Sequence, residues 1–588
     1  MKIHFINKPI NLRSNCIFDG CNKVLTGTIR LDNFTKEDGV FVCDLTQLGI
    51  TPSKMRSRGF YTHAYGGGHS ELFIGDRPCS VSRYPKAGSW LYISDYKTQT
   101  LDALCSEVGN LEDGFFYTDD TPKAWKESAD IWIQGYWAYD WANSFEQIDV
   151  WDKETGYIKA CPPYGLYGYQ KGQRFCFLNV KEEIKPGDYA IDYQNNLLYF
   201  LPFEDGALQD VRLSVTKSPC FEFINQENIV IKNCVINGFV GDAIHIKNCR
   251  NIRFENCTIY NIGGRATFVE DSEDICFEHC EIFHIDETGI DIKCGDRKTL
   301  TPSNSGIKNC LIHDCGAWCK TFSPAINLNG VGLYAKGNTV FDCPHNGIFY
   351  YGNEIKITDN VIYNVLLETQ DAGAIYSGRD YTCRGNEVSD NLICLVKGKL
   401  GFGTMGIYND DCMSGTIMER NVFYKVQRAV FLGGGVDFVV KNNVFIACEP
   451  ALNWDLRGTF DTPQWRRVMR ILKERFYGIE NGVNGASELY LSRYPELQKI
   501  HEAFQQSEGL PFIPSSGVAI GNIYFGKGVE SEWNLTQKDF ETFYVVQDNK
   551  TVSTESELQD SITPFQYEKF LKAKAIELKL FIPNIKYL

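Results

Sequence analysis

Polar residues recur along the chain at regular intervals, and a short run of apolar residues follows each of them. Ten of these anchors occur, and successive anchors lie 22 to 31 residues apart except for one gap of 79. The spacing is typical of one coil of a parallel β-helix, in which equivalent positions of stacked coils lie roughly 4.8 Å apart. We therefore expect the anchors to hydrogen-bond one another along the stack while the apolar residues fill its interior. The anchors are Asn233, Asn256, His279, Asn309, Asn338, Asn360, Asn391, Asn421, Asn443 and Asn522.

A second pattern places a small residue before Ile or Val at a fixed phase of the coils. A strand whose side chains point alternately inward and outward gives this pattern, so the outward residues are predicted to form a flat face along the solenoid. Both patterns predict an all-β fold, a parallel β-helix. The segments are AIHI (243–246), GIDI (289–292), AINL (325–328), GIFY (347–350), AIYS (374–377), GIYN (406–409) and AVFL (429–432).

The two patterns divide the chain into five parts. Residues 1–45 contain short strand-like runs with Gly turns and predict first coils or an N-terminal cap. Residues 46–215 lack the anchor and contain NN and GD dipeptides between strand-like runs, which indicate an inserted β-rich module of hairpins. The solenoid proper is predicted over 216–458, a helical insertion over 459–515, and final coils with a C-terminal cap over 516–588.

The helical insertion accounts for the gap of 79 residues between two anchors. Within it, Trp465, Val468, Met469, Leu472 and Phe476 recur at helical spacing, which predicts an amphipathic helix packed on the solenoid near its acidic face. A second apolar helical segment, FQYEKFLKAKAIELKL, lies in the C-terminal tail. We expect it to close the end of the solenoid, because an open end exposes unpaired strand edges.

Composition narrows the possible partners. The 588-residue chain carries a net charge of −15 and has no run rich in Lys or Arg, which argues against a nucleic-acid partner because phosphate binding needs a basic face. Aromatic residues make up 13% of the chain. They suit stacking on sugar rings, and they are equally good strand formers.

The 22 cysteines are spread through the chain, and several directly follow an anchor, as Cys234, Cys257 and Cys280 do. We expect free thiols that act as small buried side chains in the core. No Cys or His pairs stand at zinc-site spacing, residues 1–13 contain no apolar export segment, and no apolar run approaches about 18 residues. The sequence therefore predicts a cytoplasmic protein with no membrane association, no metal and no cofactor.

Acidic residues cluster in two neighbouring coils, in ETQDAGAIYSGRD (368–380) and GIYNDDCMSG (406–415). They are Glu368, Asp371, Asp380, Asp410 and Asp411. Asp380 and Asp410 each precede their coil's anchor by 11 residues, so equal phase on adjacent coils would bring these two carboxyl groups within roughly 5 to 8 Å. Glycoside hydrolysis uses paired carboxylates at about 5 to 9.5 Å.

Such a pair has a chemical use. One carboxyl group, whose pKa is raised by its neighbour's charge, protonates the leaving oxygen, while the ionised one attacks the anomeric carbon or activates water. The alternative is that these aspartates cap backbone N–H groups in turns.

Further polar residues on the same face are candidates for binding sugar hydroxyl groups, although each of them also has a structural explanation. Alternation along GYWAYDW also predicts that Trp137, Tyr139 and Trp141 share one side of a strand, as a sugar-stacking platform or as a domain interface. The polar candidates are Asp291, Asn327, Asn329, His345, Asn346, Glu368, Tyr376, Arg379, Asp455 and Arg457.

Ten segments of the chain, taken in order, resemble the right-handed parallel β-helix proteins of glycoside hydrolase family 141. They are GGGHSELFIGDRPCSVSRYP, GYWAYDWANS, CGDRKTLTP, PAINLNGVG, PHNGIFYYGNE, ETQDAGAIYSGRDYTCRGN, GIYNDDCMSGT, RAVFLGGG, NWDLRG and YLSRYPEL. The resemblance implies α-L-fucosidase or xylanase activity with two catalytic aspartates, Asp371 and either Asp410 or Asp411. Counting coils favours Asp380 with Asp410, and the sequence leaves both pairings open.

These observations predict a glycoside hydrolase that cleaves O-glycosidic bonds of oligosaccharides with two aspartates, and exo-action on a terminal sugar such as fucose or xylose follows from the expected cytoplasmic location. Two alternatives remain. One is a polysaccharide lyase with Arg379 or Tyr376 as its base, and the other is a glycan-binding β-helix without catalysis.

Overall fold

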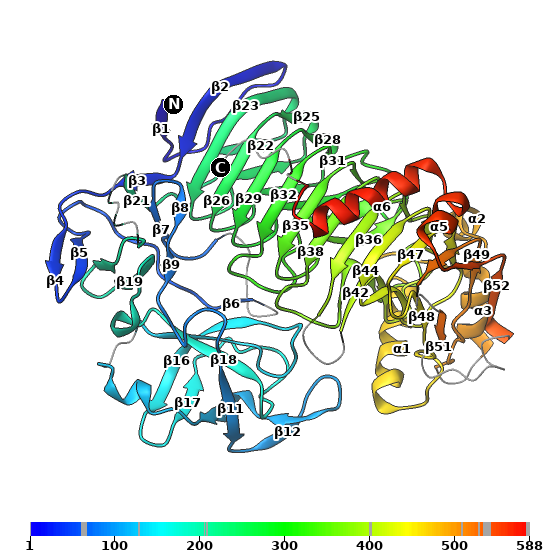
Figure 1. Cartoon of the computed structure of the whole chain (residues 1–588), viewed down its shortest axis with the longest axis horizontal. Coiled ribbons are helices and arrows are strands. Elements are labelled where there is room, and N and C mark those ends of the chain that lie inside the picture. The colour runs from blue at the N-terminus through cyan, green and yellow to red at the C-terminus, as the bar shows by residue number, and fades with distance from the viewer. Residues whose placement is uncertain are drawn as a thin grey trace.

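The computed structural model describes the chain except for residues 1, 60–66, 127–129, 205, 207, 209, 399–402, 507–509, 527–529, 533–541, 582 and 584–588. The protein is a right-handed parallel β-helix with a β-rich module at one side and helices at the far end (Figure 1). Strands of successive coils stack in register and form two long parallel sheets, one of 23 strands and one of 11. The fold predicted from the sequence is confirmed.

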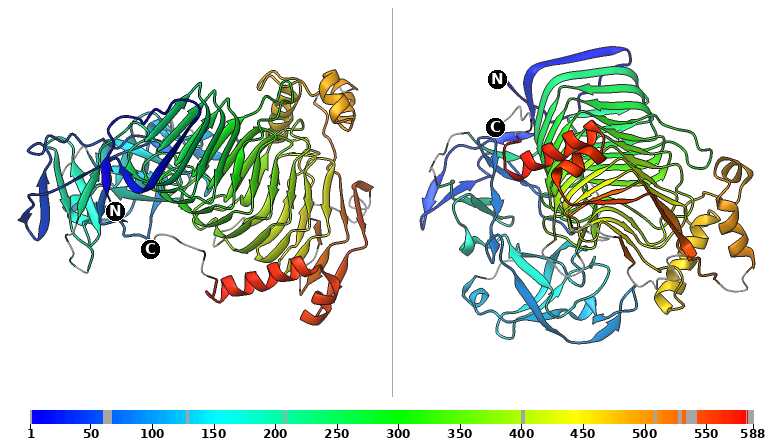
Figure 2. Two further views of the ribbon diagram at one scale, coloured as in Figure 1. Left: turned by 90° about the horizontal axis from the view of Figure 1, so that it is seen from above. Right: turned by 45° about the vertical axis from the view of Figure 1, so that its right-hand side comes forward.

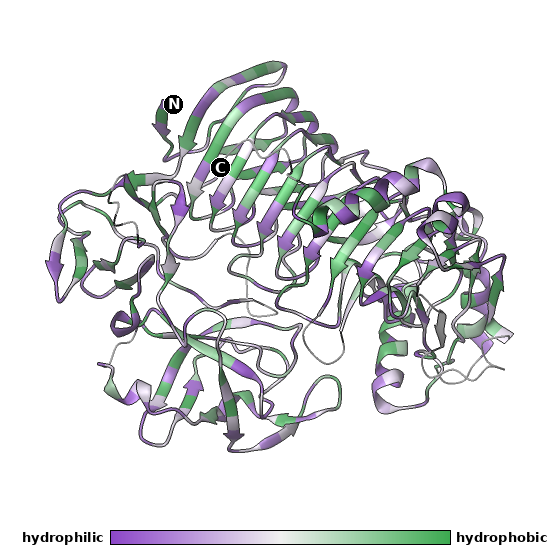
Figure 3. Cartoon of the chain, in the orientation of Figure 1, coloured by the Kyte–Doolittle hydropathy of each residue, from purple (hydrophilic) through white to green (hydrophobic). Residues whose placement is uncertain are grey.

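One coil illustrates the repeat. It consists of β24 (Ile244–Lys247), β25 (Arg250–Glu255) and β26 (Thr258–Ile262), and each strand pairs in parallel with its counterpart in the next coil. Inward side chains such as Ile246 are fully buried, while the outward positions alternate with them. Figure 3 shows this mixture of hydrophobic and hydrophilic residues along the stacked strands.

The 11-stranded sheet contains the second sequence pattern in register, since Ile290, Ile326 and Ile348 are direct neighbours on adjacent strands. All three are fully buried. The sheet therefore has the predicted flat outer face. Its strands are β22 (Phe221–Ile224), β24, β27 (Thr267–Glu270), β30 (Ile290–Cys294), β33 (Ile326–Val331), β36 (Ile348–Asn353), β39 (Ala372–Gly378), β42 (Thr404–Asp410), β45 (Arg428–Leu432), β48 (Leu452–Trp454) and β51 (Glu530–Glu532).

The expected asparagine ladder exists from Asn338 onward. Each side-chain amide donates to the Oδ1 of the next Asn at 2.9 to 3.1 Å, and the ladder continues past Asn522 to Asn549, which the repeat count missed. The amide of each Asn also donates to a backbone carbonyl, as Asn391 does to Ile357 at 2.9 Å. The ladder thus satisfies polar groups that are completely buried.

The first four anchors do not belong to this ladder. Asn233, Asn256, His279 and Asn309 adopt positive φ at a turn, and the cysteine after each one takes the ladder position. The backbone N–H of Cys310 accordingly donates to Oδ1 of Asn338 at 3.0 Å, where the two types of ladder meet. The 22 cysteines form no disulfide, and those at ladder positions are buried, as predicted.

The N-terminal residues contribute to both the solenoid and the module. β2 (Cys16–Thr26) pairs in parallel with β23 (Glu227–Phe239) and forms the first coil. The next strands, β3 (Thr28–Arg30) and β5 (Val40–Asp44), pair instead with β21 (Val211–Ser214) and β20 (Leu197–Phe200). These pairings place the start of the module near residue 28 rather than residue 46.

The module contains an antiparallel sheet that includes β15 (Trp132–Gly135), β16 (Ser144–Asp152) and β18 (Arg174–Leu178). It docks on the solenoid through a buried ion pair, in which Nη2 of Arg58 donates to Glu287 at 2.7 Å. This docking holds the loops of the module over the outer face of the 11-stranded sheet.

The helical insertion contains α1 (Pro463–Phe476), α2 (Glu488–Arg493) and α3 (Leu497–Gln506). The apolar stripe of α1 is buried as predicted. The C-terminal helices are α5 (Glu555–Ser561) and α6 (Pro564–Glu577). The expected closing helix, α6, instead packs on β41 (Leu392–Val396) and β44 (Val422–Val426), along the flank of the solenoid (Figure 2). No helix within the described residues has the length and apolar character needed to span a bilayer.

Candidate active site

A pocket of about 1000 Å³ lies on the outer face of the 11-stranded sheet. Its floor comes from β33, β36, β39 and β42. The module supplies one wall with Tyr139, Trp141 and Tyr167, and the helical insertion supplies another with Trp465 and Asn481. The sequence prediction that the insertion packs near the aspartate face is therefore confirmed.

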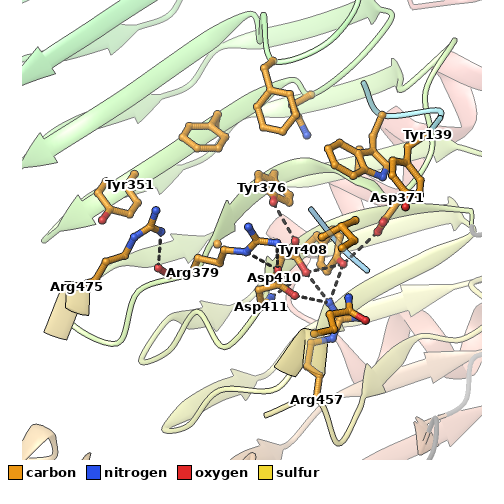
Figure 4. A pocket seen from close by; sticks show the side chains of 18 of the residues that line it. Tyr139, Tyr351, Asp371, Tyr376, Arg379, Tyr408, Asp410, Asp411, Arg457 and Arg475 are labelled. Atoms are coloured by element: carbon orange, nitrogen blue, oxygen red, sulfur yellow. Dashed lines mark hydrogen bonds and ion pairs between the residues drawn. The ribbon is translucent and has the colours of Figure 1, made fainter. Parts of the chain in front are cut away.

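Three aspartates converge in this pocket (Figure 4). Asp371 directly precedes β39, Asp410 is the last residue of β42, and Asp411 follows it at the turn. Gly373 permits the approach of Asp371, because a Cβ atom there would lie 2.7 Å from Cβ of Tyr408. Oη of Tyr408 lies 2.7 Å from Oδ1 of Asp410 and 3.2 Å from Oδ1 of Asp371, so one hydroxyl group bridges the two carboxyl groups.

Two arginines hold Asp410 and Asp411. Arg379 forms an ion pair with Asp411 at 2.5 Å. Arg457 lies 2.5 Å from Asp410 and 3.3 Å from Asp411, and its Nε donates to Asp455 at 2.6 Å. Arg457 thus joins three carboxylates at the back of the site.

The environment separates the acidities of the three aspartates. Burial raises the pKa of Asp371. Burial, assisted by the charge of Asp411, raises the pKa of Asp410 to about 7. Burial also acts to raise the pKa of Asp411, but Arg379 and Arg457 outweigh it and hold that pKa below its usual value. Asp411 is therefore ionised, whereas burial favours the protonated form of both Asp371 and Asp410.

The hydrogen bonds indicate which member of the pair keeps the proton. Asp410 accepts from Tyr408, from Tyr376 at 3.0 Å, from the backbone N–H of Asp411 at 2.8 Å and from Arg457. Asp371 contacts Tyr408 and forms no ion pair with an arginine within the part of the chain that the structure describes. Tyr408 has one proton to donate, so its short contact to Asp410 leaves the contact with Asp371 to a proton carried by Asp371.

Most of the predicted site residues line this pocket: Asp371, Asp410, Asp411, Asn329, His345, Asn346, Tyr376, Arg379, Asp455 and Arg457. His345 is well defined chemically. Its Nδ1 accepts the backbone N–H of Phe322 at 3.0 Å, and burial lowers its pKa to about 3. The ring is therefore neutral with its proton on Nε2, which makes Nε2 a hydrogen-bond donor.

Asp380 does not line the pocket, and the predicted pairing of Asp380 with Asp410 is wrong. In the strand register Gly378 is the neighbour of Asp410, so Asp380 lies two residues past that position, after the end of β39. Its carboxylate is completely buried and accepts from Tyr351 at 2.5 Å, from Thr382 and from Asn481 at 3.1 Å, with Arg297 at 3.4 Å. Counting from the anchor failed because the two coils distribute their residues differently between strand and turn.

Four other predicted residues also lie outside the pocket. Asp291 forms an ion pair with Arg265 at 2.9 Å and accepts a hydrogen bond from Asn327 at 2.7 Å. Asp291 and Asn327 therefore contact each other on the sheet face. Glu368 forms an ion pair with Lys320.

Trp137 is buried in the core of the module, where its indole N–H donates to Ser144 at 2.7 Å. The alternation predicted for Trp137 fails because β15 ends at Gly135, two residues before it.

Tyr408 and Tyr351 line the pocket but were not among the predicted site residues. Tyr408 stands in an outward position of the second pattern, and Tyr351 directly follows the segment GIFY (347–350), so the sequence contained a signal for both. Arg475 and Glu480 of the insertion had no such signal, because only the folded chain brings them to the pocket. Among the described residues, no group of three or more His, Cys, Asp or Glu side chains is arranged to hold a metal ion.

Comparison with known proteins agrees with the fold. The family model for a right-handed β-helix region matches residues 203–362 and 242–399. A solved structure described as a glycoside hydrolase superimposes with a TM-score of 0.51 at 11% identity, covering 96% of this chain and 89% of that one.

Two more distant structures also match. XylC in complex with xylose has a TM-score of 0.30 at 11% identity and covers 93% of this chain and 80% of its own. The surface adhesin PfbA of Streptococcus pneumoniae has a TM-score of 0.28 at 12% identity, with 57% and 68% covered. No curated protein matches the sequence of this chain. These likenesses concern the fold alone.

Proposed function

We propose that this protein is a glycoside hydrolase that cleaves an O-glycosidic bond with Asp371 and Asp410. The observation that carries the proposal is the bridged pair itself: two carboxyl groups of raised pKa meet at one tyrosine hydroxyl inside a pocket of the size of an oligosaccharide site. Paired carboxyl groups in different protonation states are the requirement of this reaction.

In this mechanism Asp371 is the general acid. It gives its proton to the glycosidic oxygen as the bond to the anomeric carbon breaks, while the carboxylate of Asp410 adds to that carbon and forms a glycosyl ester. Asp371, now ionised, then takes a proton from water as that water attacks the ester, which releases the sugar and restores both groups. Asp411 stays ionised and pairs with Arg457, which also contacts Asp410 and keeps it oriented.

The separation of the pair favours retention of the anomeric configuration. The closest oxygens of Asp371 and Asp410 are no farther apart than the sum of their distances to Tyr408, 3.2 and 2.7 Å. That sum is below the roughly 6.5 to 9.5 Å at which inverting enzymes accommodate a water molecule between the carboxyl groups.

Several finer points remain part of the proposal. The resemblance to glycoside hydrolase family 141 supports an α-L-fucosidase or a xylosidase or xylanase. Walls on two sides of the pocket support exo-action on short oligosaccharides, and the cytoplasmic location expected from the sequence is consistent with imported substrates.

A screen of aryl glycosides tests the proposal, with α-L-fucosyl, β-xylosyl, α-L-arabinosyl and β-galactosyl substrates. Release of the aryl group by the wild-type protein, and its loss in Asp410→Asn, is the expected result. A rise in ultraviolet absorbance on a uronate polymer would support a lyase instead. A lyase needs a base. Tyr376 is poorly suited to that role, because it donates to Asp410 and burial raises the pKa of Tyr376 well above its usual value.

A further inference from the structure

The pocket has two sides of different chemistry, and the catalytic aspartates lie between them. In Figure 4, Tyr139 lies with Asp371 on one side, and Tyr351 and Arg475 lie on the opposite side. The first side is built by the aromatic residues Tyr139, Trp141 and Tyr167 of the module. The second presents the hydrogen-bonding groups of Tyr351, Arg475 and Asn481, and the insertion also contributes Trp465 to the pocket lining.

The aromatic side forms a rigid unit. The rings of Tyr139 and Trp141 stack with their centroids 5.3 Å apart at an angle of 13°, and Tyr167 packs edge-on against Trp141 at 4.8 Å. The hydroxyl of Tyr139 donates to Asp102 at 2.6 Å. All three rings are only partly buried, so they offer ring surface to the pocket.

This unit is fixed directly beside the general acid. Asp140, which lies between Tyr139 and Trp141 in the sequence, forms an ion pair with Arg174 and accepts a hydrogen bond from the side chain of Gln370 at 2.6 Å. Arg174 also donates to the backbone carbonyl of Glu368 at 2.7 Å. The segment that ends in Asp371 is thereby bound to the loop that presents Tyr139 and Trp141.

Asp380 holds the polar groups of the opposite side from behind. Its carboxylate accepts from Tyr351 at 2.5 Å and from Asn481 at 3.1 Å, and both of these residues line the pocket. Arg475 is fixed there by Glu480 and by the backbone carbonyl of Arg379. Such groups suit the hydroxyls of a sugar ring rather than its apolar face.

We infer that the leaving group of the substrate is itself a sugar ring and binds on the module's aromatic side, while the sugar that is transferred to Asp410 binds on the polar side. The inference rests on the proposed function. The general acid must contact the glycosidic oxygen, so the departing part of the substrate lies on the side of Asp371. There the stacked rings match the apolar face of a pyranose.

The test compares substrates with and without a second ring. Fluoride is a leaving group too small to reach Trp141, so α-L-fucosyl fluoride and β-D-xylosyl fluoride report the polar side alone. The corresponding ring-bearing substrates are 2′-fucosyllactose and xylobiose. For Trp141→Ala we expect kcat/KM to fall at least about tenfold on the ring-bearing substrate and far less on the fluoride.

Two further variants sharpen the comparison. Trp141→Phe keeps an aromatic face, and we expect a loss intermediate between wild type and Trp141→Ala, which a folding defect would not produce. Tyr92→Ala removes an exposed aromatic side chain of the same module that does not line the pocket, and both substrates should be turned over as by wild type.

The outcomes separate the inference from the function on which it rests. Equal losses on both substrates in a folded Trp141→Ala protein would overturn the assignment of the leaving group while leaving the hydrolase intact. A wild-type protein that releases fluoride from neither glycosyl fluoride and cleaves neither ring-bearing substrate would overturn the proposed function, and the assignment with it.

Discussion

The hydroxyl of Tyr408 lies 2.7 Å from Asp410 and 3.2 Å from Asp371, and Arg457 donates to the hydroxyl oxygen of Tyr408 at 3.2 Å. The shorter contact and the guanidinium group both favour the arrangement in which Tyr408 donates to Asp410 while Asp371 keeps its own proton. Tyr408 acts as a positioning residue, because it sets the distance between the proton donor and the ionised group.

Replacing Tyr408 by Phe should lower kcat by about 10- to 10²-fold, since a hydrogen bond to a charged group contributes about 1.5 to 3 kcal/mol. The pH profile should change as well. Tyr408 donates to the carboxylate of Asp410, so the variant should raise the pKa of Asp410, and the acidic limb of kcat/KM, which reports protonation of that group, should shift to higher pH.

Tyr376→Phe is the matched control, because Tyr376 contacts Asp410 alone of the pair. Both variants remove a donor to Asp410, so in both the acidic limb should lie above the pH of about 7 at which Asp410 is protonated in wild type. The alkaline limb, which reports loss of the acid's proton, should move only in Tyr408→Phe. An alkaline limb that does not move in Tyr408→Phe would show that the bridge plays no part in the ionisation of Asp371.

Replacing Asp371 or Asp410 by Asn should each lower the rate by at least about 10² to 10⁴, because each change removes a proton donor or a nucleophile while keeping the shape. The Asp371→Asn protein should retain more activity on an aryl glycoside with a good leaving group, which needs little protonation. Steady-state kinetics on a series of aryl leaving groups measures the difference.

Stability measurements separate loss of chemistry from loss of folding. The pKa of Asp371 is raised in the folded protein, so this group stabilises the fold fully below about pH 3.9, and that stability is lost as pH rises through the folded pKa. Asp371→Asn should therefore melt no lower than wild type at pH 7. If Asp371→Asn and Asp410→Asn both keep wild-type turnover on the best substrate, the two-aspartate mechanism is wrong.

The fold was predictable because its cause is local and repeated. An anchor followed by apolar residues recurs once per coil, and each coil needs the same inward side chains. The repeat did not predict which residue of each coil occupies the ladder position. Four anchors lie one residue before the ladder position, because a cysteine fills the same space there and the preceding residue adopts positive φ in the turn.

The site residues that stand on strands of the 11-stranded sheet were predictable. Asp410 and Tyr376 stand on strands whose pattern is visible in the sequence, and both reach the pocket. The prediction for Asp380 was wrong because its position depends on which of residues 378–390 belong to a strand and which to a turn. The walls from the module and the insertion depend on docking contacts over long sequence separations, such as that of Arg58 with Glu287.

Replacing Asp380 by Asn should lower the free energy of unfolding at pH 7 by about 3 to 5 kcal/mol, because Arg297 would lose its buried ionic partner. Burial acts to raise the pKa of Asp380, but Arg297 and several hydrogen bonds lower it overall. The stabilising contribution is therefore present above about pH 3.9 and is lost as pH falls through the folded pKa.

Denaturant unfolding of wild type and Asp380→Asn at several pH values between 5 and 8 checks this. The difference should stay constant over that range. Asp291→Asn is the comparison, since Asp291 is also buried and ion-paired but lies away from the insertion. A difference that grows or vanishes within this range would mean that Asp380 titrates near neutral pH.

The thiols are predicted to be free in the native protein. The structure contains 22 unpaired cysteines, and many occupy core positions. Titration of thiols in denaturant without reductant should find close to all of them if the protein is made in a reducing compartment. Recovery of several intact disulfides from the native source would contradict the cytoplasmic prediction.

The asparagine ladder predicts a pair of opposite effects. Asn391 accepts from the backbone N–H of Asn360 at 2.9 Å and from its side chain at 3.0 Å, so Asn391→Ala leaves buried donors unpaired. We expect a loss of about 1 to 3 kcal/mol in the free energy of unfolding. Cys310→Asn should have the reverse sign, because its new amide would donate to Oδ1 of Asn338 and extend the ladder by one coil. Thermal unfolding of both variants beside wild type decides the question, and a destabilised Cys310→Asn would show that the cysteine coils are too narrow to hold the amide.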